Sequence, residues 1–236
     1  MEVINRISRI LALIVVYVIC GYGYLVAKGF VFGNGIPVLS NQAYAKASYP
    51  QKIDGQLMIG ESLMRSVGSD NAPISMYVFS SMICSHCGDF HKNIYPKLEG
   101  DFISKGKLRF VFVHLPTDDM SMQAAKLSYC LPEDKFYGFI DELYSRRDWK
   151  FAKDDSKLND YAKKYGFNDD DIARCKDNKK ITSDILLVRE NAITKLGIQA
   201  TPSFVIESSK GKELMVGIDN YKKIQNYLND LLNEGE

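Results

Sequence analysis

The sequence has almost no excess of charge of either sign. Its 236 residues include 30 Lys and Arg against 29 Asp and Glu, which leaves a formal net charge of +1. Mixed charges in this balance give no electrostatic footprint for nucleic acid, and we expect no nucleic-acid partner. Internal repeats are also absent, which excludes a repeat array. The length suffices for one domain with a substantial core and an insertion.

Metal-binding residues are scarce as well. The chain has five cysteines and three histidines, with a single C-x-x-C motif, Cys84-Ser85-His86-Cys87. Zinc in a structural site takes four ligands in tetrahedral geometry, and no second C-x-x-C motif supplies the other two. His86 lies inside the motif, where it is poorly placed to join His91 in a metal site. We expect neither a metal nor another cofactor; a metal site and a pair of inert buried thiols are the less favoured alternatives.

The C-x-x-C motif lies between a strand pattern and a helix pattern. A β-rich run at residues 74–80 precedes it, and apolar residues at helical spacing follow it. At a helix N-terminus, unpaired N–H groups and the helix dipole stabilise a thiolate. A histidine between the cysteines favours the thiolate further, and thiol pKa values in such motifs run from about 3.5 to 7.5. We therefore predict thiol–disulfide exchange at Cys84 and Cys87. Ser85 and His86 are expected to tune the thiol pKa.

A proline begins a second strand pattern near the C-terminus. The run from Gly197 to Ile206 places Pro202 just before the apolar residues that read as a strand. A proline at the start of a strand removes no central ladder bond. Because cis peptides are almost confined to X–Pro bonds, Thr201–Pro202 is the candidate cis bond, with an ordinary trans proline as the alternative. A cis proline beside the cysteines exposes the preceding backbone, on which an extended substrate can add as a strand.

These two segments resemble the DsbA-type branch of the thioredoxin superfamily. The shared features are the strand, the C-x-H-C motif that opens a helix, and the later G-x-x-x-T-P-S-F, and the likeness runs from Gly68 onward. The resemblance implies an α/β, thioredoxin-like fold with an inserted helical domain. It implies that Cys84 is the nucleophile and Cys87 the resolving cysteine, and that Thr201 and Pro202 face the sulfurs and bind substrate. The partners it implies are reduced or unfolded secreted proteins and a quinone-linked membrane oxidase.

Two positions depart from the family pattern. Thioredoxin-fold oxidoreductases often carry a buried Asp or Glu six residues before the first cysteine, where this chain has Val78. Strongly oxidising DsbA enzymes typically have Val before the cis-proline, whereas Thr201 is more familiar in isomerases. We predict a monomeric protein-disulfide oxidase. A disulfide isomerase or reductase of the same fold is the main alternative, and an exported metal-binding chaperone is the third.

The remaining cysteines are Cys20, Cys130 and Cys175. With Cys20 in a targeting segment, four cysteines remain, and an even number in an exported protein suggests pairing. If the motif cysteines pair with each other, Cys130 is left with Cys175, and some DsbA-like proteins carry such a second pair in the helical region. The alternative is that both are small buried hydrophobes. We expect a structural disulfide, whose long loop stabilises the fold by roughly 4 kcal/mol in the chain-entropy model.

The first 45 residues have the pattern of a signal peptide or an N-terminal membrane anchor. Arg6 and Arg9 precede an apolar run at residues 10–27, and Ala43-Tyr44-Ala45 offers small residues to a signal peptidase. The distance from the run to that site is unusually long for a secretory signal, whereas the run itself is borderline for spanning a bilayer, and cleavage is slightly favoured over an uncleaved anchor. Either way we expect a periplasmic or otherwise extracytoplasmic catalytic domain, a compartment that permits stable disulfides.

The rest of the chain divides by its apolar periodicity. We expect a lead-in segment at 46–70, a thioredoxin-like domain at 71–116 and 179–236, and a helical insertion at 117–178. Within the lead-in, residues 56–67 read as one amphipathic helix. Within the insertion, Asn168 is expected to cap a helix, because a side-chain oxygen there accepts from free N–H groups.

Overall fold

The computed structural model describes residues 30–33, 36–39, 50–218 and 220–233, which belong to two units, Met1–Ala47 and Ser48–Glu236. In the first unit, β1 (Phe30–Gly33) pairs antiparallel with β2 (Ile36–Leu39). None of the helices in the described part of the chain has the length and apolar character that a membrane crossing requires. The apolar run at 10–27, predicted to target or anchor the protein, lies outside the described residues.

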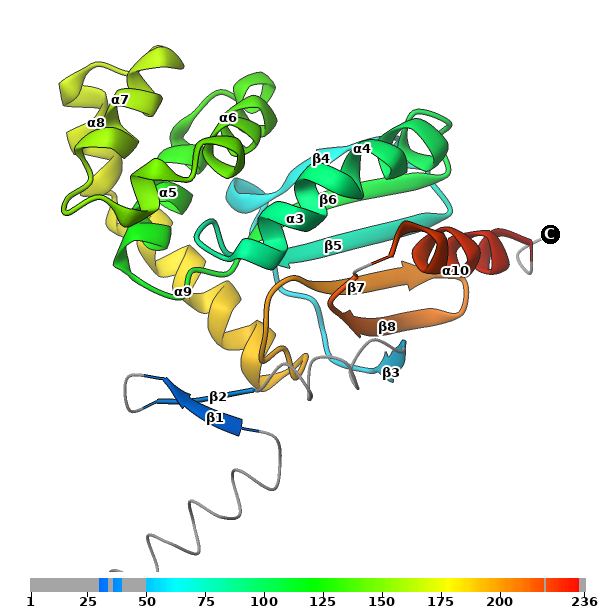
Figure 1. Ribbon diagram of the computed structural model, residues 1–236. Coiled ribbons are helices and arrows are strands. Elements are labelled where there is room, and N and C mark those ends of the chain that lie inside the picture. The colour runs from blue at the N-terminus through cyan, green and yellow to red at the C-terminus, as the bar shows by residue number, and fades with distance from the viewer. Residues whose placement is uncertain (1–29, 34–35, 40–49, 219, 234–236) are drawn as a thin grey trace, which may run out of the picture. The chain divides into compact units, whose positions relative to one another are not determined.

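The second unit is built on a six-stranded mixed sheet in the order β3-β8-β7-β5-β6-β4 (Figure 1). Its strands are β3 (Gln51–Ile53), β4 (Arg65–Val67), β5 (Ile74–Ser80), β6 (Leu108–His114), β7 (Ser203–Ser208) and β8 (Gly211–Val216). Only the β5–β6 pair is parallel within this sheet, and its other pairs are antiparallel. The predicted strand at 74–80 is therefore confirmed as β5, at the centre of the sheet.

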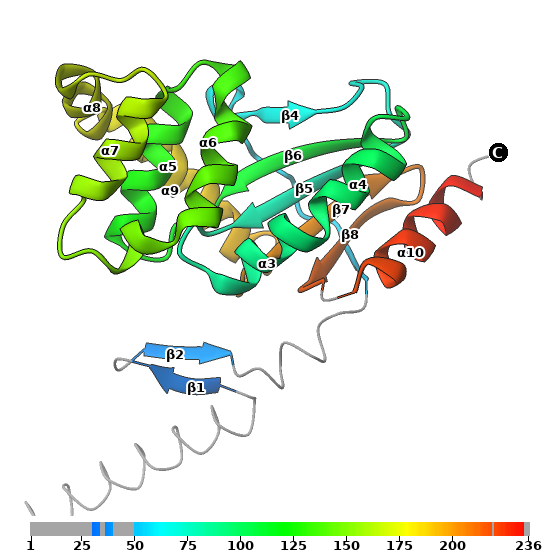
Figure 2. The ribbon, with the colours of Figure 1, turned by 45° about the horizontal axis from the view of Figure 1, so that its top comes forward.

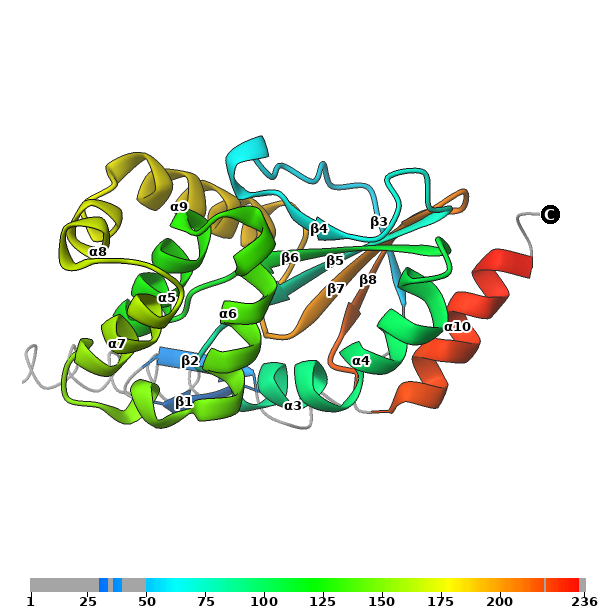
Figure 3. The same ribbon diagram turned by 90° about the horizontal axis from the view of Figure 1, so that it is seen from above.

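Some helices pack on one side of the sheet, and a separate block of helices lies at one end of it. α3 (Ser85–Asn93), α4 (Tyr95–Leu98) and the π-helical turn η2 (Glu99–Ile103) connect β5 to β6, and α10 (Tyr221–Asn233) follows β8. α3, α4 and α10 lie on the same side of the sheet (Figure 3). The register of the strands places Val78 of β5 between Phe112 of β6 and Phe204 of β7. On this side of the sheet, Phe90 of α3 packs on Phe204, with ring centroids 4.8 Å apart.

A block of helices interrupts the sheet between β6 and β7 and gathers at one end of it (Figure 2). It contains α5 (Asp119–Cys130), α6 (Glu133–Arg146), the 3-10 turn η3 (Asp148–Phe151), α7 (Ser156–Lys164), α8 (Asp169–Lys176) and α9 (Lys179–Thr194). Side chains begin three of them: Asp118, Asn168 and Asn178 each accept a hydrogen bond from an amide of the first turn. The predicted cap at Asn168 is confirmed. The predicted α/β fold with a block of inserted helices is confirmed as well.

Residues 56–67 are not the amphipathic helix that their spacing predicts. The segment holds only a 3-10 turn, η1 (Glu61–Leu63), and then the edge strand β4, which pairs antiparallel with β6. Tertiary partners decide this, because Leu63 is buried in the core and the Arg65 guanidinium donates to the Tyr129 carbonyl at 3.1 Å. The segment predicted as a lead-in thus supplies both edge strands of the sheet, β3 and β4.

Candidate active site

Cys84 occupies the N-cap of α3, just beyond the end of β5. The chain turns there, and the Cys84 amide donates to the Ser81 carbonyl at 3.0 Å. The Cys84 backbone is extended (φ −68°, ψ 125°), and its sulfur accepts a hydrogen bond from the Cys87 amide at 3.4 Å. That amide is one of the first-turn groups without a helical acceptor. The strand-to-helix junction therefore directs the Cys84 sulfur at the N–H groups of α3.

Thr201 and Pro202 lie beside this sulfur. The Thr201–Pro202 peptide bond is cis, and it leads directly into β7, which pairs with β5. The Cys84 thiol donates a hydrogen bond to the Thr201 carbonyl at 3.3 Å. The strand pairing of β5 with β7 thus brings together two segments that are more than one hundred residues apart in the sequence. The two segments that carry the family resemblance, the C-x-x-C motif and the Thr201–Pro202 bond, therefore lie next to each other in the structure.

The two thiols, both reduced in this structure, differ in exposure and in acidity. Cys84 is partly exposed, and a hydrogen bond from the Cys87 thiol is the main cause that lowers its pKa to about 6. A hydrogen bond with Thr201 and two backbone N–H groups lower the pKa further, whereas burial opposes them. Cys87 is fully buried, and burial raises its pKa well above the ordinary value; the hydrogen bond and charge of Cys84 act the same way. Near neutral pH the thiolate is therefore favoured at the partly exposed sulfur, and the buried sulfur keeps its proton.

A pair of hydroxyl groups that the sequence did not reveal lies next to the buried thiol. Ser80 and Tyr144 are both buried, and their oxygens are 2.8 Å apart. A hydrogen bond with Ser80 lowers the pKa of Cys87, against the larger effect of burial. Side chains alternate along a strand, so Ser80 shares the sheet face of Val78. This alternation could have pointed to Ser80 from the sequence alone. No sequence pattern pointed to Tyr144, which comes from α6.

The three histidines have different surroundings. His86 is exposed on the first turn of α3. His91 is buried, pairs with the Asp141 carboxylate and stacks on Tyr95, which ties α3 to α6. His114 is buried 2.7 Å from the Ser128 hydroxyl, and burial lowers its pKa to about 3, with the Arg65 charge contributing. No three potential metal ligands of the His, Cys, Asp and Glu types come together within the part of the chain that the structure describes.

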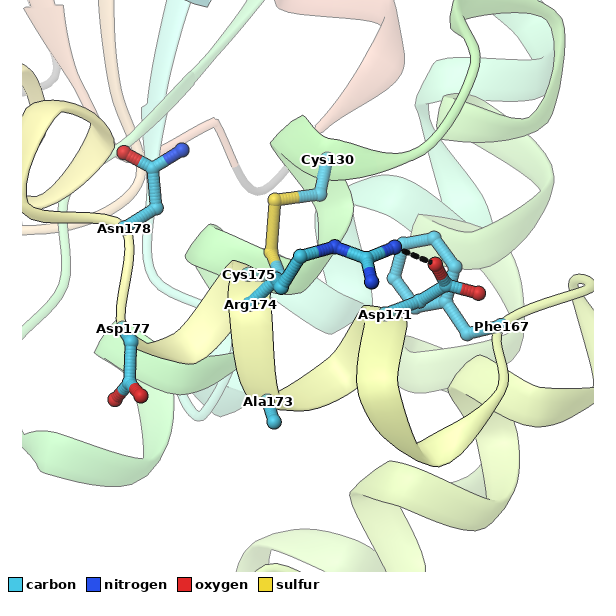
Figure 4. A pocket seen from close by; sticks show the side chains of 8 residues that line it. All are labelled: Cys130, Phe167, Asp171, Ala173, Arg174, Cys175, Asp177 and Asn178. Carbon is cyan, nitrogen blue, oxygen red and sulfur yellow. Dashed lines mark hydrogen bonds and ion pairs between the residues drawn. A yellow bond between two sulfur atoms is a disulfide. The ribbon is translucent and has the colours of Figure 1, made fainter.

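The other two cysteines are joined by a disulfide inside the helical block. Cys130 ends α5 and Cys175 lies in the last turn of α8, with an S–S distance of 2.03 Å and a Cα–Cα distance of 6.2 Å. Figure 4 shows this bond at the wall of a pocket, beside the ion pair of Arg174 and Asp171. The disulfide fastens α8 to α5 and, unlike the first pair, joins residues in the last turns of their helices.

Known proteins share this architecture over most of the chain. The sequence model of a family described as Thioredoxin matches residues 62–229. The chain belongs to the thioredoxin family. Among solved structures, this thioredoxin-family protein is similar to α-DsbA1 of Wolbachia pipientis, with 29% identity, a TM-score of 0.67, and coverage of 75% of this chain and 95% of that one. BdbD of Bacillus subtilis, at 23% identity and a TM-score of 0.65, shares the fold; 77% of this chain and 98% of that one are covered.

Curated relatives carry names that agree with these structures. The probable disulfide bond formation protein D of Bacillus anthracis is 27% identical over 124 residues, which are 51% of this chain and 57% of the relative. A putative protein-disulfide oxidoreductase of Rickettsia typhi is 24% identical over 176 residues, 73% of this chain and 62% of the relative. The matches thus span less than two thirds of the length of these relatives. Together with the fold, they place the chain among DsbA-type members of the thioredoxin family.

Proposed function

We propose that this protein is an exported thiol:disulfide oxidoreductase that introduces disulfides into secreted proteins by exchange through Cys84 and Cys87. The observation that carries the proposal is the asymmetry of the two thiols. Cys84 is partly exposed with a pKa of about 6, whereas Cys87 is buried with a raised pKa. The names of the relatives, disulfide bond formation protein and protein-disulfide oxidoreductase, support the same activity.

In the proposed cycle, the oxidised pair accepts electrons from a substrate in two steps. A substrate thiolate attacks Cys84 Sγ, the bond between Cys84 and Cys87 breaks, and its electron pair remains on Cys87 Sγ. Because the pKa of Cys87 is raised, that sulfur takes up a proton from the medium. The substrate is then held in a mixed disulfide with Cys84, with its backbone able to pair beside Thr201.

A second substrate thiolate then attacks the substrate sulfur of the mixed disulfide. The substrate leaves with a new disulfide, and the electron pair of the broken bond remains on Cys84 as a thiolate. A thiol with a pKa of about 6 is a good leaving group, because lower thiol pKa values speed departure. The stable thiolate also favours the reduced enzyme, which is the property of an oxidant. We propose a quinone-linked membrane oxidase as the partner that takes the two electrons from the reduced pair.

A redox equilibrium with glutathione tests the proposal. The full chain, in detergent, is equilibrated with mixtures of reduced and oxidised glutathione, and the free Cys84 and Cys87 are counted after alkylation by mass spectrometry. A dithiol oxidant is expected to have a reduction potential of about −120 to −150 mV. A value of about −230 mV or below would contradict the oxidase, and no exchange at all would contradict the whole assignment. Labelling of Cys84 in intact cells by a thiol reagent that does not cross the inner membrane tests export.

A disulfide isomerase is the second candidate, and Thr201 favours it. A hydrogen bond with Thr201 lowers the pKa values of both Cys84 and Cys87, which makes both sulfurs better leaving groups and helps to release substrate from a mixed disulfide, the step that an isomerase repeats. Recovery of activity by a substrate with scrambled disulfides, measured with reduced protein, separates the two. We expect slow recovery and a monomer in size-exclusion chromatography with light scattering; fast recovery by a dimer or trimer would reverse the assignment.

A further inference from the structure

A short turn in the helical block reaches the active site. This turn, η3, follows α6 and is anchored by Trp149, which is fully buried and donates from Nε1 to the Leu143 carbonyl at 2.8 Å. Arg147, which ends α6, has a left-handed backbone (φ 47°) that turns the chain sharply into η3. Two cationic side chains therefore lie on either side of the buried Trp149 in the sequence, Arg147 before it and Lys150 after it.

Both cations contact the residues that flank Cys84. The Lys150 Nζ donates to the Ile83 carbonyl at 3.3 Å, and the Arg147 Nη2 is 3.4 Å from the Ser85 carbonyl and 3.1 Å from the Asp89 carboxylate. A Cβ at Gly88 would lie 2.8 Å from the Arg147 Nη2. The glycine inside the first turn of α3 thus makes room for the Arg147 side chain. Positive charge from the insertion lies over the start of the helix that carries the thiolate.

Lys150 and the Cys84 thiolate interact through their charges. Burial and the Arg147 charge lower the pKa of Lys150, whereas the charges of Cys84 and Asp89 raise it. Interaction between two charges is reciprocal, so an ammonium group stabilised by the thiolate stabilises the thiolate in turn. The other charged or ionisable groups around this site are His86, Cys87 and Asp89 on α3, with Tyr144 of α6 and Arg147 at its end.

We propose that Lys150 is an electrostatic tuning residue through which the helical insertion makes the Cys84–Cys87 pair more oxidising, with Arg147 holding η3 against α3. This deepens the proposed function and rests on it, because it assumes that the redox state of Cys84 is what the protein uses. Removing the ammonium charge destabilises the Cys84 thiolate. The reduced protein then becomes less favoured relative to the disulfide, and the protein becomes a weaker oxidant.

Four variants of the full chain test the role of Lys150. Lys150→Met removes the charge and keeps the apolar stem, Lys150→Gln is a second neutral variant in case the first fails to fold, and Lys150→Arg keeps the charge. Lys153→Met is the matched control, an exposed lysine of the following loop. Two quantities are measured for each: the pH dependence of thiolate absorbance in the ultraviolet, and the equilibrium constant with glutathione.

The neutral variants are expected to raise the pKa of Cys84 and to lower the equilibrium constant for oxidising glutathione about threefold. A threefold change corresponds to about 14 mV, since tenfold is about 30 mV for two electrons. Lys150→Arg and Lys153→Met are expected to match the wild type in both quantities.

Two results would overturn the proposal. If the neutral variants match Lys153→Met in both quantities, Lys150 only holds the turn in place. If Lys150→Arg shifts both quantities as far as Lys150→Met does, packing rather than charge is responsible. The thiolate titration needs no turnover and no oxidised partner. A protein that shows the pKa shift yet fails to exchange with glutathione would therefore contradict the proposed function and not the role of Lys150.

Discussion

The two cysteine pairs of this protein lie at opposite ends of helices. Cys84 caps the N-terminus of α3, where its sulfur accepts from a backbone amide. Cys130 and Cys175 lie in the last turns of α5 and α8, and the Cys175 sulfur is 3.0 Å from the Lys126 carbonyl oxygen. Helix N-termini stabilise negative charge and C-termini disfavour it. A thiolate is favoured in the first pair and disfavoured in the second.

Because of this difference, the same functional group, the cysteine thiol, has different chemistry in the two pairs. A stable thiolate favours the reduced state, so the first pair readily gives up its disulfide to a substrate. At the ends of α5 and α8, with the Lys126 carbonyl oxygen beside the Cys175 sulfur, ionisation is disfavoured and reduction gains no such stabilisation. The second pair also closes a loop with a sequence separation of 45 residues, which restricts the unfolded chain. The first pair is built for exchange and the second for stability.

Removal of a cysteine from the first pair is the largest perturbation of this comparison. Cys84→Ala is expected to abolish exchange, because no other exposed thiol lies at the N-terminus of α3. Cys87→Ser is expected to retain the first step and accumulate mixed disulfides with substrates. Oxidation of a dithiol peptide measures the first effect, and non-reducing gels measure the second. Appreciable turnover by Cys84→Ala would show that the assignment of the nucleophile is wrong.

Removal of the second pair is expected to affect stability and spare exchange. The double variant Cys130→Ser, Cys175→Ser loses the closed loop, at a cost of about 2 to 4 kcal/mol in unfolding free energy. Denaturant unfolding at neutral pH gives this value, and peptide oxidation under native conditions gives the activity. An unchanged unfolding free energy, or lost activity in a folded variant, would break the division between the two pairs.

Features that depend on interactions between residues close in the sequence could be predicted, and features that depend on distant residues could not. The central strand at 74–80 and the cap at Asn168 depend on local pattern and were predicted correctly. Residues 56–67 were predicted wrongly, because the antiparallel partner strand β6 and the core override their helical spacing. Tyr144 and Lys150 were missed as neighbours of the active site. They come from the insertion, about sixty residues beyond Cys84, and only the packing of α6 and η3 brings them there.

Acid is expected to destabilise the fold around α5, the helix that carries Cys130 of the second pair. His114 lies against Ser128 of α5, and its pKa is about 3 in the fold, below the ordinary value of 6.5. Its contribution to stability is complete above pH 6.5 and is lost as the pH falls towards 3, because the unfolded chain takes up the proton first.

Unfolding of His114→Gln across this range tests the effect. The wild type is expected to lose on the order of 2 kcal/mol more than the variant between about pH 6.5 and 4. The variant itself is expected to be less stable at neutral pH, since Ser128 loses its imidazole partner. Parallel curves for the two proteins over this interval would contradict the depressed pKa of His114.

The smallest expected effect lies at the first pair and depends on its redox state. The folded pKa of Cys84, about 6, is below the ordinary thiol value of 9.0, so ionisation stabilises the reduced fold. This contribution is complete above pH 9.0 and is lost as the pH falls through about 6. The oxidised protein has no Cys84 thiol to titrate. Reduced protein should therefore gain stability over oxidised protein as the pH rises from about 6 to 8, by on the order of 1 kcal/mol at pH 7.

Cys87 does not disturb this interval, because its pKa is raised above 9.0 and its own cost begins only at more alkaline pH. Denaturant unfolding of reduced and oxidised protein at several pH values measures the difference, and reduced Cys84→Ser, which keeps Cys87, is the control without the ionising thiol. A pH-independent difference between the reduced and oxidised wild type would mean that the α3 N-terminus does not hold a thiolate. The contrast between the two cysteine pairs would then rest on exposure alone.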